Sequence, residues 1–165
     1  MYQYEDNLES ERLITRFVNR NDVRDWSEFF KDPVSTQYFP SSFFASHEAP
    51  SETWINRQLK RYAENRYGLQ ALIDKQSGQL VGQCGLLVQE VDGVAELEVG
   101  YHILTRYRGL GFAPEAAKRF IDYAFANRLS DSVISVIDTR NAPSCRVAEK
   151  NGLQREKTTY WSGIE

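Results

Sequence analysis

Residues 94–127 of the chain read VAELEVGYHILTRYRGLGFAPEAAKRFIDYAFAN, and this stretch decides the fold. Its first residues alternate in polarity: Leu97 and Val99 fall on one face, while Glu96 and Glu98 fall on the other. This period of two predicts a strand with one core face and one face that carries carboxylates. In the later part, apolar residues recur at steps of three and four, which predicts an amphipathic helix. The stretch therefore reads as a strand, a turn and a helix.

The turn between this strand and this helix contains two glycines. It reads RYRGLGFA over residues 106–113. Gly109 and Gly111, with the small Ala113, allow the backbone to come close to a ligand. A helix that begins here directs unpaired N–H groups and a positive dipole end outward. The turn is therefore predicted to bind an anion, most suitably a diphosphate.

Two common nucleotide motifs fit this turn poorly. A Walker loop ends in Gly-Lys followed by Ser or Thr, and that ending is missing here. A dinucleotide fingerprint lies within a repeated parallel strand–helix unit, whereas hairpin strands precede this turn and Pro114 follows it. A nucleotide-binding module stays as a rival interpretation, which competition by ADP-ribose-type ligands but not by CoA would favour.

The rest of the chain predicts the surrounding elements. Two turn signals, residues 75–78 and Asp92-Gly93, indicate hairpins that join three antiparallel strands. In chain order the patterns predict a strand at 11–18, a helix capped by Asn19 and ending at Phe30 before Asp32-Pro33, an aromatic loop at 38–50, a helix at 51–65 capped by Ser51, strands at 69–74 and 80–89, a strand at 132–137 parallel to the 94–101 strand, a helix at 141–150 and strand composition over 153–165. The aromatic loop is interpreted either as packed by its own rings or as a wall of a substrate site.

Composition limits the classes of function. The 165 residues suffice for one domain, 1–165, and a net charge of −3 without a long basic run argues against nucleic-acid binding. Cys84 and Cys145 are far apart and lack metal-ligand spacing, so we expect no metal site and no disulfide framework. The polar N-terminal segment and the lack of a long apolar run argue against a secretory signal and a membrane span. We expect a cytoplasmic protein with no membrane partner.

Several motifs, taken together, resemble the GNAT family of N-acetyltransferases. The turn fits that family's acyl-CoA loop, Q/R-x-x-G-x-G/A, when read from Arg106 or, preferably, from Arg108. The other matching segments are LESERL at 8–13, Gly100-Tyr101, the Gly-x-Gly-aromatic-Ala run at 109–113, Glu115-Ala116, and Asn141-Ala142-Pro143-Ser144 with the helix that follows. They resemble the branch that contains the ribosomal-protein-alanine N-acetyltransferases, and the order of elements matches over residues 8–165.

The resemblance implies an α/β (α+β) GNAT fold. Its central sheet is mixed, mostly antiparallel, splayed at the acyl-CoA site and flanked by about four helices. The family normally adds a further strand after the region of Trp161, whereas this sequence stops at Glu165. That strand is expected to be very short, to come from a neighbouring subunit of a homodimer, or to be removed by truncation.

The resemblance also implies direct attack of an amine on acetyl-CoA, without an acyl-enzyme. The pyrophosphate is expected to bind N–H groups of residues 109–113, and the outgoing strand end is expected to pair with the pantetheine amides. The residues expected to bind the cofactor are His102, Ile103, Leu104, Arg108, Gly109, Leu110, Gly111, Phe112, Ala113, Asn141 and Ser144.

Two residues are predicted to act in catalysis. Glu98 matches the glutamate of the family's Glu-x-Gly-Tyr pattern and is predicted to be the base, directly or through water; the alternative is a carboxylate on a solvent-facing strand. Ser144 is predicted to protonate or hydrogen-bond the CoA sulfur, with helix capping as the alternative for Ser144 and Asn141. Arg108 is interpreted either as a phosphate contact or as a solvated arginine. His102 is interpreted as a strand residue rather than a catalyst.

The sequence thus predicts an acetyl-CoA-dependent N-acetyltransferase. The expected acceptor is a primary amine, either a protein N-terminus or a small molecule, and Glu96 and Glu98 beside the cleft favour a cationic one. The alternative is a non-catalytic acyl-CoA-binding or sensing domain of the same fold. Substituting Glu98→Gln distinguishes them, because only the enzyme loses turnover while keeping its affinity for CoA.

Overall fold

The computed structural model describes residues 3–45 and 47–161. Four strands form one sheet: β1 (Leu13–Phe17), β2 (Leu69–Asp74), β3 (Leu80–Val91) and β4 (Val94–Ile103). The α-helices are α1 (Asp22–Lys31), α2 (Pro33–Thr36), α3 (Pro50–Ala63), α4 (Phe112–Ala126) and α5 (Ala142–Lys150), with 3₁₀ turns at Ser41–Ala45 and Thr105–Tyr107. Only the single-turn α2, which the side chain of Asp32 caps, has no counterpart among the predicted helices.

The sheet is antiparallel in chain order, and β4 lies at its edge. Both predicted hairpins are present, one between β2 and β3 and one between β3 and β4. On the outer side of β4, a parallel bridge joins Glu98 to Ile134. There the Ile134 N–H donates to Leu97 O and the Val99 N–H donates to Ile134 O, both at 2.9 Å. The strand predicted at 132–137 therefore keeps its parallel direction but is reduced to one bridge, and the described chain shows no further bridge beyond it.

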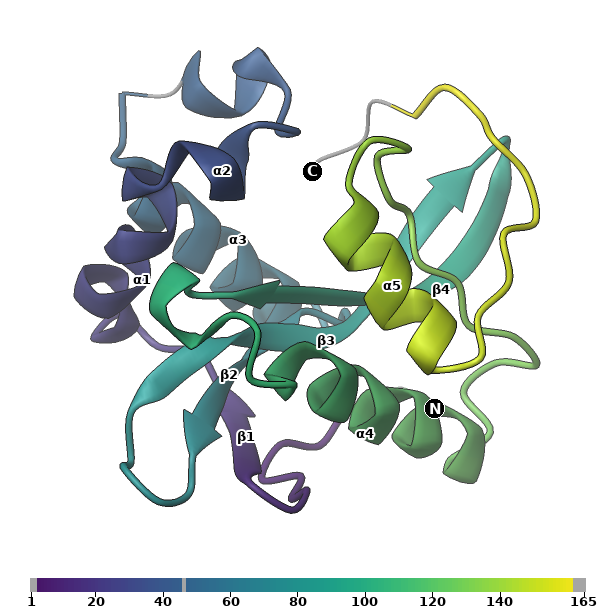
Figure 1. The fold of residues 1–165 in the computed structure, drawn as a ribbon, viewed down its shortest axis with the longest axis horizontal. Helices are drawn as coiled ribbons and strands as arrows, with labels where there is room; N and C mark the ends of the chain where they lie inside the picture. The colour runs from purple at the N-terminus through teal and green to yellow at the C-terminus, as the bar shows by residue number, and fades with distance from the viewer. Residues whose placement is uncertain (1–2, 46, 162–165) are drawn as a thin grey trace.

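Helices cover both faces of the sheet (Figure 1). On one face, α4 packs its alanines and Phe120 against Leu97 and Val99. On the other face, α1 and α3 contribute Trp26, Phe29, Trp54 and Ile55 to a second, aromatic core with Leu69, Ala71 and Leu87. Because side chains alternate along a strand, Glu98, Gly100 and His102 of β4 face the aromatic side.

The structure corrects two predicted helix caps. Helix α1 begins at Asp22 with Asn21 as its N-cap, and the side chain of Asn19 instead accepts the Asn21 N–H at 2.9 Å in the preceding turn. Helix α3 begins at Pro50, which suits a first helical position because its missing N–H costs no bond there. Ser51 consequently lies inside the first turn, where its hydroxyl donates to Val23 O at 2.6 Å and ties α3 to α1.

The C-terminal segment also differs from its prediction. Residues 153–161 have no regular secondary structure, although their composition predicted a strand. Asp92, at the β3–β4 hairpin, holds the segment by accepting the Thr159 hydroxyl at 2.6 Å and pairing with Lys157 at 2.8 Å. The remainder of that predicted strand, 162–165, lies outside the described residues. Within the described ranges, every helix is too short or too polar to span a bilayer.

Candidate active site

The glycine turn and the start of α4 form a cradle of main-chain N–H groups. Gly109 and Gly111 have φ angles of +75° and +83°, in the left-handed region that favours glycine. Helix α4 starts at Phe112, and its first N–H groups have no acceptor within the helix. A Cβ added at Gly109 would meet no atom within 4 Å, so space is open above the backbone. The predicted anion site therefore has the required form.

Arg12 stabilises this turn through contacts with Leu110 and Phe112. Its guanidinium donates to Leu110 O at 2.8 Å, and its central carbon lies 4.4 Å from the centre of the Phe112 ring. Glu115, in the first turn of α4, holds Arg12 through its Nε at 2.7 Å and its main-chain N–H at 2.9 Å. Glu115 also accepts the Ser10 hydroxyl at 2.5 Å. The segment before β1 is thus fastened to the cradle by one carboxylate.

Arg108 points away from the cradle. Its Nε donates to Ile103 O at 3.2 Å, one terminal nitrogen donates to the Ser35 hydroxyl at 2.5 Å, and the other lies 3.4 Å from Asp32. The pKa of Asp32 is lowered by several hydrogen bonds, with that from Thr105 the largest, and to a smaller extent by the charge of Arg108. Arg108 is exposed, as the solvated-arginine interpretation predicts, and its side chain also links the turn to α2. Its contact with phosphate stays a prediction.

The open edge of β4 offers fewer main-chain groups than the sequence predicted. Val99 bonds outward to Ile134, so in an antiparallel ladder Tyr101 and Ile103 also point outward, while His102 faces its β3 partner Gln83. The Leu104 N–H donates to Val81 O at 3.0 Å within the fold. The prediction that His102 and Leu104 offer main-chain groups to pantetheine is therefore corrected, because His102 faces β3 and the Leu104 N–H is bonded within the fold. The role of Ile103 stays a prediction.

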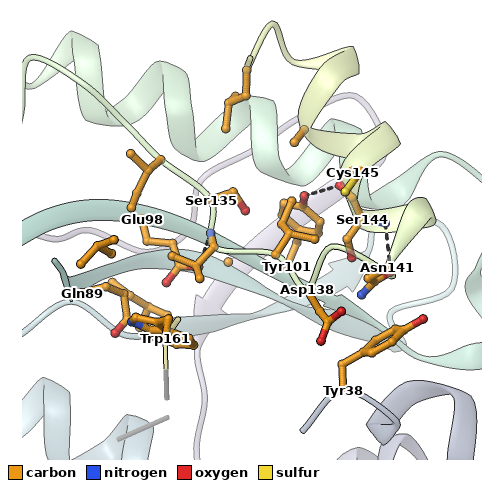
Figure 2. Close-up of a pocket in the computed structure, with 18 of the residues that line it drawn as sticks. Tyr38, Gln89, Glu98, Tyr101, Ser135, Asp138, Asn141, Ser144, Cys145 and Trp161 are labelled. Carbon is orange, nitrogen blue, oxygen red and sulfur yellow. Dashed lines mark hydrogen bonds between the residues drawn. The ribbon is translucent and has the colours of Figure 1, made fainter. Parts of the chain in front are cut away.

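Glu98 lies at the floor of a large cavity that Tyr101, Asn141 and Ser144 also line (Figure 2). The side chain is 6% exposed, so the solvent-facing alternative is wrong. Its Oε1 accepts the Val136 N–H at 3.1 Å. Burial raises the pKa of Glu98 to about 7, and hydrogen bonds from Val136 and Gln89 and the charge of Arg61 act in the opposite direction. A carboxyl with this pKa exchanges a proton near neutral pH, as a general base must.

Ser144 and Asn141 lie at the start of α5, on the opposite side of the cavity from α3. The Asn141 side chain caps the helix by accepting the Ser144 N–H at 3.3 Å, so the capping alternative is confirmed for Asn141. The Tyr101 hydroxyl donates to Ser144 O at 2.7 Å and ties β4 to this helix start (Figure 2). Both Ser144 and the half-buried Cys145 line the cavity. The proposed action of Ser144 on the sulfur stays a prediction.

His102 is a strand residue set among aromatic rings. Its ring centre lies 4.9 Å from that of Trp54, 5.6 Å from that of Phe29 and 6.2 Å from that of Phe39, each nearly edge-on. Burial, with a further contribution from Arg108, lowers the pKa of His102 to about 4. The imidazole is therefore neutral near pH 7 and takes up a proton only in acid.

The cavity has a volume of about 1370 Å³ and lies between α5 on one side and α3 on the other. Its α5 side carries Asn141 and Ser144, and its α3 side carries Trp54, Arg57 and Arg61. Gly100 forms part of the floor between Glu98 and His102, and Leu69 and Leu87 flank it. A chamber of this form can hold one ligand along the β4 edge and a second over the aromatic face.

Sequence reasoning missed several of these residues. Arg12 and Glu115 are far apart in the chain, although both belong to segments that matched the family motifs. Arg57 and Arg61 had only their helical spacing as a signal, and surface arginines share that spacing. The aromatic loop gave the clearest signal: Tyr38 and Phe39 do line the cavity, while Phe43 is buried in the aromatic core.

Comparison with known proteins gives concordant matches. A family model described as an acetyltransferase (GNAT) domain matches residues 12–154. The protein YkkB of Bacillus subtilis (strain 168) is 34% identical over 154 residues, which cover 92% of this chain and 87% of YkkB. The crystal structure of a GNAT-family acetyltransferase from Bacillus anthracis has a TM-score of 0.73 at 25% identity, over 91% of this chain and 84% of that one. RimL, a ribosomal alpha-N-protein acetyltransferase in complex with coenzyme A, has the same fold with a TM-score of 0.71 at 11% identity, over 89% and 82% of the two chains.

Proposed function

We propose that this chain, which belongs to the GNAT family of acetyltransferases, transfers an acetyl group from acetyl-CoA to a primary amine by direct attack. The observation that carries the proposal is Glu98, a buried carboxyl with a pKa of about 7 at the floor of the cavity. It lies three residues before Tyr101, whose main-chain groups face outward from β4, so a proton acceptor lies near the open strand edge.

The cofactor half of the proposed site, formed by the glycine turn and the outer edge of β4, suits acetyl-CoA, which supplies the activated acetyl thioester. The N–H groups from Gly109 to Ala113 would hold its pyrophosphate, because α4 directs its positive dipole end and unpaired donors there. Arg12 keeps the turn in this form through Leu110 O. The main-chain groups of Tyr101 and Ile103 would pair with the pantetheine arm and orient the thioester, as a peptide does at a strand edge.

Glu98 would remove the proton from the attacking amine, directly or through water. Amines are largely protonated near neutral pH, so a group with a matched pKa is needed to supply the nucleophile. The Val136 N–H and Gln89 fix the carboxylate, which limits the reorganisation required at the moment of reaction. Ser144 would donate a hydrogen bond to the departing sulfur from the opposite wall. Its position is maintained by Asn141 and Tyr101.

The acceptor class in this proposal is a peptide N-terminus or a small-molecule amine. Family membership supports acetyl transfer. Protein N-termini are included among the candidate acceptors because RimL, which has the same fold, is named as a ribosomal alpha-N-protein acetyltransferase. Fold alone does not choose between these acceptors.

The experiment is acceptor-dependent release of thiol from acetyl-CoA by the wild type and by Glu98→Gln. We expect kcat to fall by about a hundredfold to ten-thousandfold, the usual contribution of general base catalysis, with unchanged affinity for acetyl-CoA. Glu90→Gln, on the exposed part of β3, is the matched control. Equal activity of Glu98→Gln and the wild type would remove Glu98 from the mechanism. Binding of acetyl-CoA without turnover of any amine would favour a sensing domain instead.

A further inference from the structure

One wall of the cavity consists of aromatic rings. Tyr38 and Phe39 belong to the loop after α2, Trp54 belongs to α3, and these three residues, the aromatic wall, all line the cavity. The rings of Phe39 and Trp54 are nearly parallel, at 12°, with their centres 5.8 Å apart. Tyr38 and Phe39 are half-buried, so part of each ring is left to contact a ligand. Surface of this kind favours a flat apolar ligand, because contact releases water from both.

The aromatic wall is held in place by polar contacts at both ends. The Tyr38 hydroxyl donates to Arg140 O at 3.1 Å, and the central carbon of the Arg140 guanidinium lies 5.2 Å from the centre of the Tyr38 ring. At the other end, the Trp54 Nε1–H donates to the side-chain oxygen of Gln83 on β3 at 2.9 Å. A wall fixed in this way loses little freedom when a ligand binds, which favours affinity.

His102 adds a neutral polar group beside the aromatic wall. It also lines the cavity, and its ring centre lies 4.9 Å from that of Trp54 and 6.2 Å from that of Phe39. The neutral imidazole has one hydrogen-bond donor and one acceptor. Within residues 3–45 and 47–161, neither ring nitrogen forms a hydrogen bond. Both positions are therefore available to a ligand in the cavity.

The residue opposite His102 in the sheet has an unused donor as well. Gln83 pairs with His102 in the β3–β4 ladder and is 0% exposed. Its Oε1 accepts the Trp54 Nε1–H, but its Nε2 has no acceptor among the residues that the structure describes. Buried donors without acceptors are rare in folded proteins, so this pair indicates that a polar partner binds at this end of the cavity.

Glu98 and His102 lie on the same face of β4, four residues apart, and so about 13 Å apart at Cα. Strand side chains stand roughly perpendicular to the sheet, so two hydrogen bonds of about 3 Å each leave about 7 Å between the ligand atoms that these residues bind. The floor between them is apolar, because Leu69 and Leu87 lie against Gly100 and line the cavity. One six-membered ring with a short arm spans this distance.

We propose that the acceptor is an amine with a flat apolar body that ends in a neutral hydrogen-bonding oxygen: the amine lies beside Glu98, the body contacts the aromatic wall, and His102 binds the oxygen. The inference rests on the proposed acetyl transfer and specifies its substrate class. A neutral oxygen suits this position, because transferring a charged group from water to a place among aromatic rings costs far more free energy.

The test compares acceptors built on one skeleton. Phenethylamine has the flat body alone, tyramine adds a neutral hydroxyl at its far end, and 4-(2-aminoethyl)benzoic acid adds a carboxylate there. Ethanolamine lacks the body, and 1,4-diaminobutane replaces it with a second cation. We expect tyramine to exceed phenethylamine by about fivefold to tenfold in kcat/KM through KM, the gain from one hydrogen bond, and to exceed the other three by about tenfold or more.

Three variants assign this preference to its residues. His102→Phe keeps a ring among the same aromatic neighbours and removes both nitrogens, so the ratio of tyramine to phenethylamine should fall to about one. Phe39→Leu removes flat surface and should lower kcat/KM for both ring-bearing amines while leaving their ratio unchanged. His47→Phe is the matched control, since His47 is exposed and outside the cavity lining, and it should behave as the wild type. The thermal shift produced by acetyl-CoA reports whether each variant is folded with its cofactor site intact.

The possible failures are distinguishable. Equal use of tyramine and phenethylamine by the wild type would overturn the inference without reference to any variant. A preference for the carboxylate, for the diamine or for peptide N-termini, or a tyramine preference that survives in folded His102→Phe, would also overturn it, while leaving acetyl transfer in place. Binding of acetyl-CoA without acetylation of any of these amines or of peptide N-termini would overturn the proposed function and this inference with it.

Discussion

The two halves of the proposed site, of which only the acceptor half lines the cavity, present different kinds of groups to a ligand. The cofactor half, from Gly109 to the first turn of α4, presents main-chain N–H groups whose positions depend on backbone conformation. The acceptor half presents side chains, among them Glu98, Trp54 and Arg61, whose effect depends on charge and shape. The cofactor half should therefore respond to changes in φ and hardly to pH, whereas the acceptor half should respond to pH and charge.

The largest expected difference is in pH dependence. Because the pKa of Glu98 is about 7, the ionised fraction falls tenfold for each pH unit below that value. At about pH 5, kcat/KM for the acceptor should be about a hundredfold below its plateau, while the affinity for acetyl-CoA should be unchanged. Steady-state kinetics and ligand titration over the same pH range measure the two quantities.

The acceptor amine titrates as well, so this profile needs a control. In the Glu98→Gln variant, titration of the acceptor amine still affects the pH profile of kcat/KM, but titration of the carboxyl does not. The difference between the two profiles isolates Glu98. If the affinity for acetyl-CoA also fell as the pH decreased below 7, the two halves would not differ in their pH dependence.

The second expected effect is on the free energy of unfolding. A substitution at Glu98, in the acceptor half, should stabilise the protein, whereas a substitution in the glycine turn should destabilise it. Burial raises the pKa of Glu98 from 4.5 to about 7, so between these values the folded protein keeps a proton that the unfolded chain has lost. Stability therefore falls as pH rises through this window, and the full cost is present above pH 7. Glu98→Gln is free of this cost and should be more stable than the wild type by about 3 kcal/mol at about pH 8, but not at about pH 4.

Chemical denaturation of both proteins at the two pH values measures this difference. Glu90→Gln, whose side chain lies on an exposed part of β3, should behave as the wild type at both. A stability gap of equal size at both pH values would mean that packing, rather than the buried charge, separates Gln from Glu.

The contrast between the halves also explains what the sequence could predict. The cradle was predictable because glycine spacing, a helix start and a strand period are local properties, and the fold they implied is confirmed by the Bacillus anthracis structure. The strand at 132–137 was predicted correctly in direction but not in length. Its length depends on how many residues around Ile134 pair with β4, and this is a contact between separate segments of the chain. The N-caps failed at Asn19 and Ser51 because each side chain found a different partner in the folded chain.

The acceptor half was only partly predictable. The alternation of polar and apolar residues placed Glu98 on the correct face of β4. It could not predict that Glu98 is buried, because the helix that covers this face, α3, comes from a distant segment. The same holds for Arg108, which a motif assigned to phosphate and which the fold pairs with Asp32 and Ser35. Side-chain environments of this kind depend on contacts between distant residues, which periodicity does not contain.

A third prediction tests the cofactor half through its backbone. Gly111→Val places a β-branched residue at a φ of +83°, which costs about 1–2 kcal/mol and shifts the turn away from its binding form. We expect the affinity for acetyl-CoA to fall about tenfold, with the pH profile of the remaining activity unchanged. Isothermal titration calorimetry gives the affinity.

Gly78→Val is the matched control for this variant. Gly78 also has a positive φ, +72°, and lies in the β2–β3 hairpin with no atom within 4 Å of an added Cβ. Gly111→Val should lose somewhat more stability, because an added Cβ there would lie 3.3 Å from Arg12, and only Gly111→Val should lose affinity. If Gly78→Val weakened acetyl-CoA binding equally, general destabilisation would account for both, and the cradle would have no special role.

The smallest expected effect comes from filling the space over β4. Gly100→Ala adds one methyl group at 3.3 Å from Leu69 and 3.5 Å from Leu87, distances that neighbouring side chains absorb by small shifts. Stability should therefore change by less than about 1 kcal/mol. KM for the acceptor should rise by about threefold to tenfold, because the methyl group displaces the Leu69 side chain, which also lines the cavity, while acetyl-CoA binds as before on the outer edge of the same strand. A loss of acetyl-CoA affinity with an unchanged acceptor KM would instead put the cofactor, rather than the amine, over Gly100, and the assignment of the two halves would have to be exchanged.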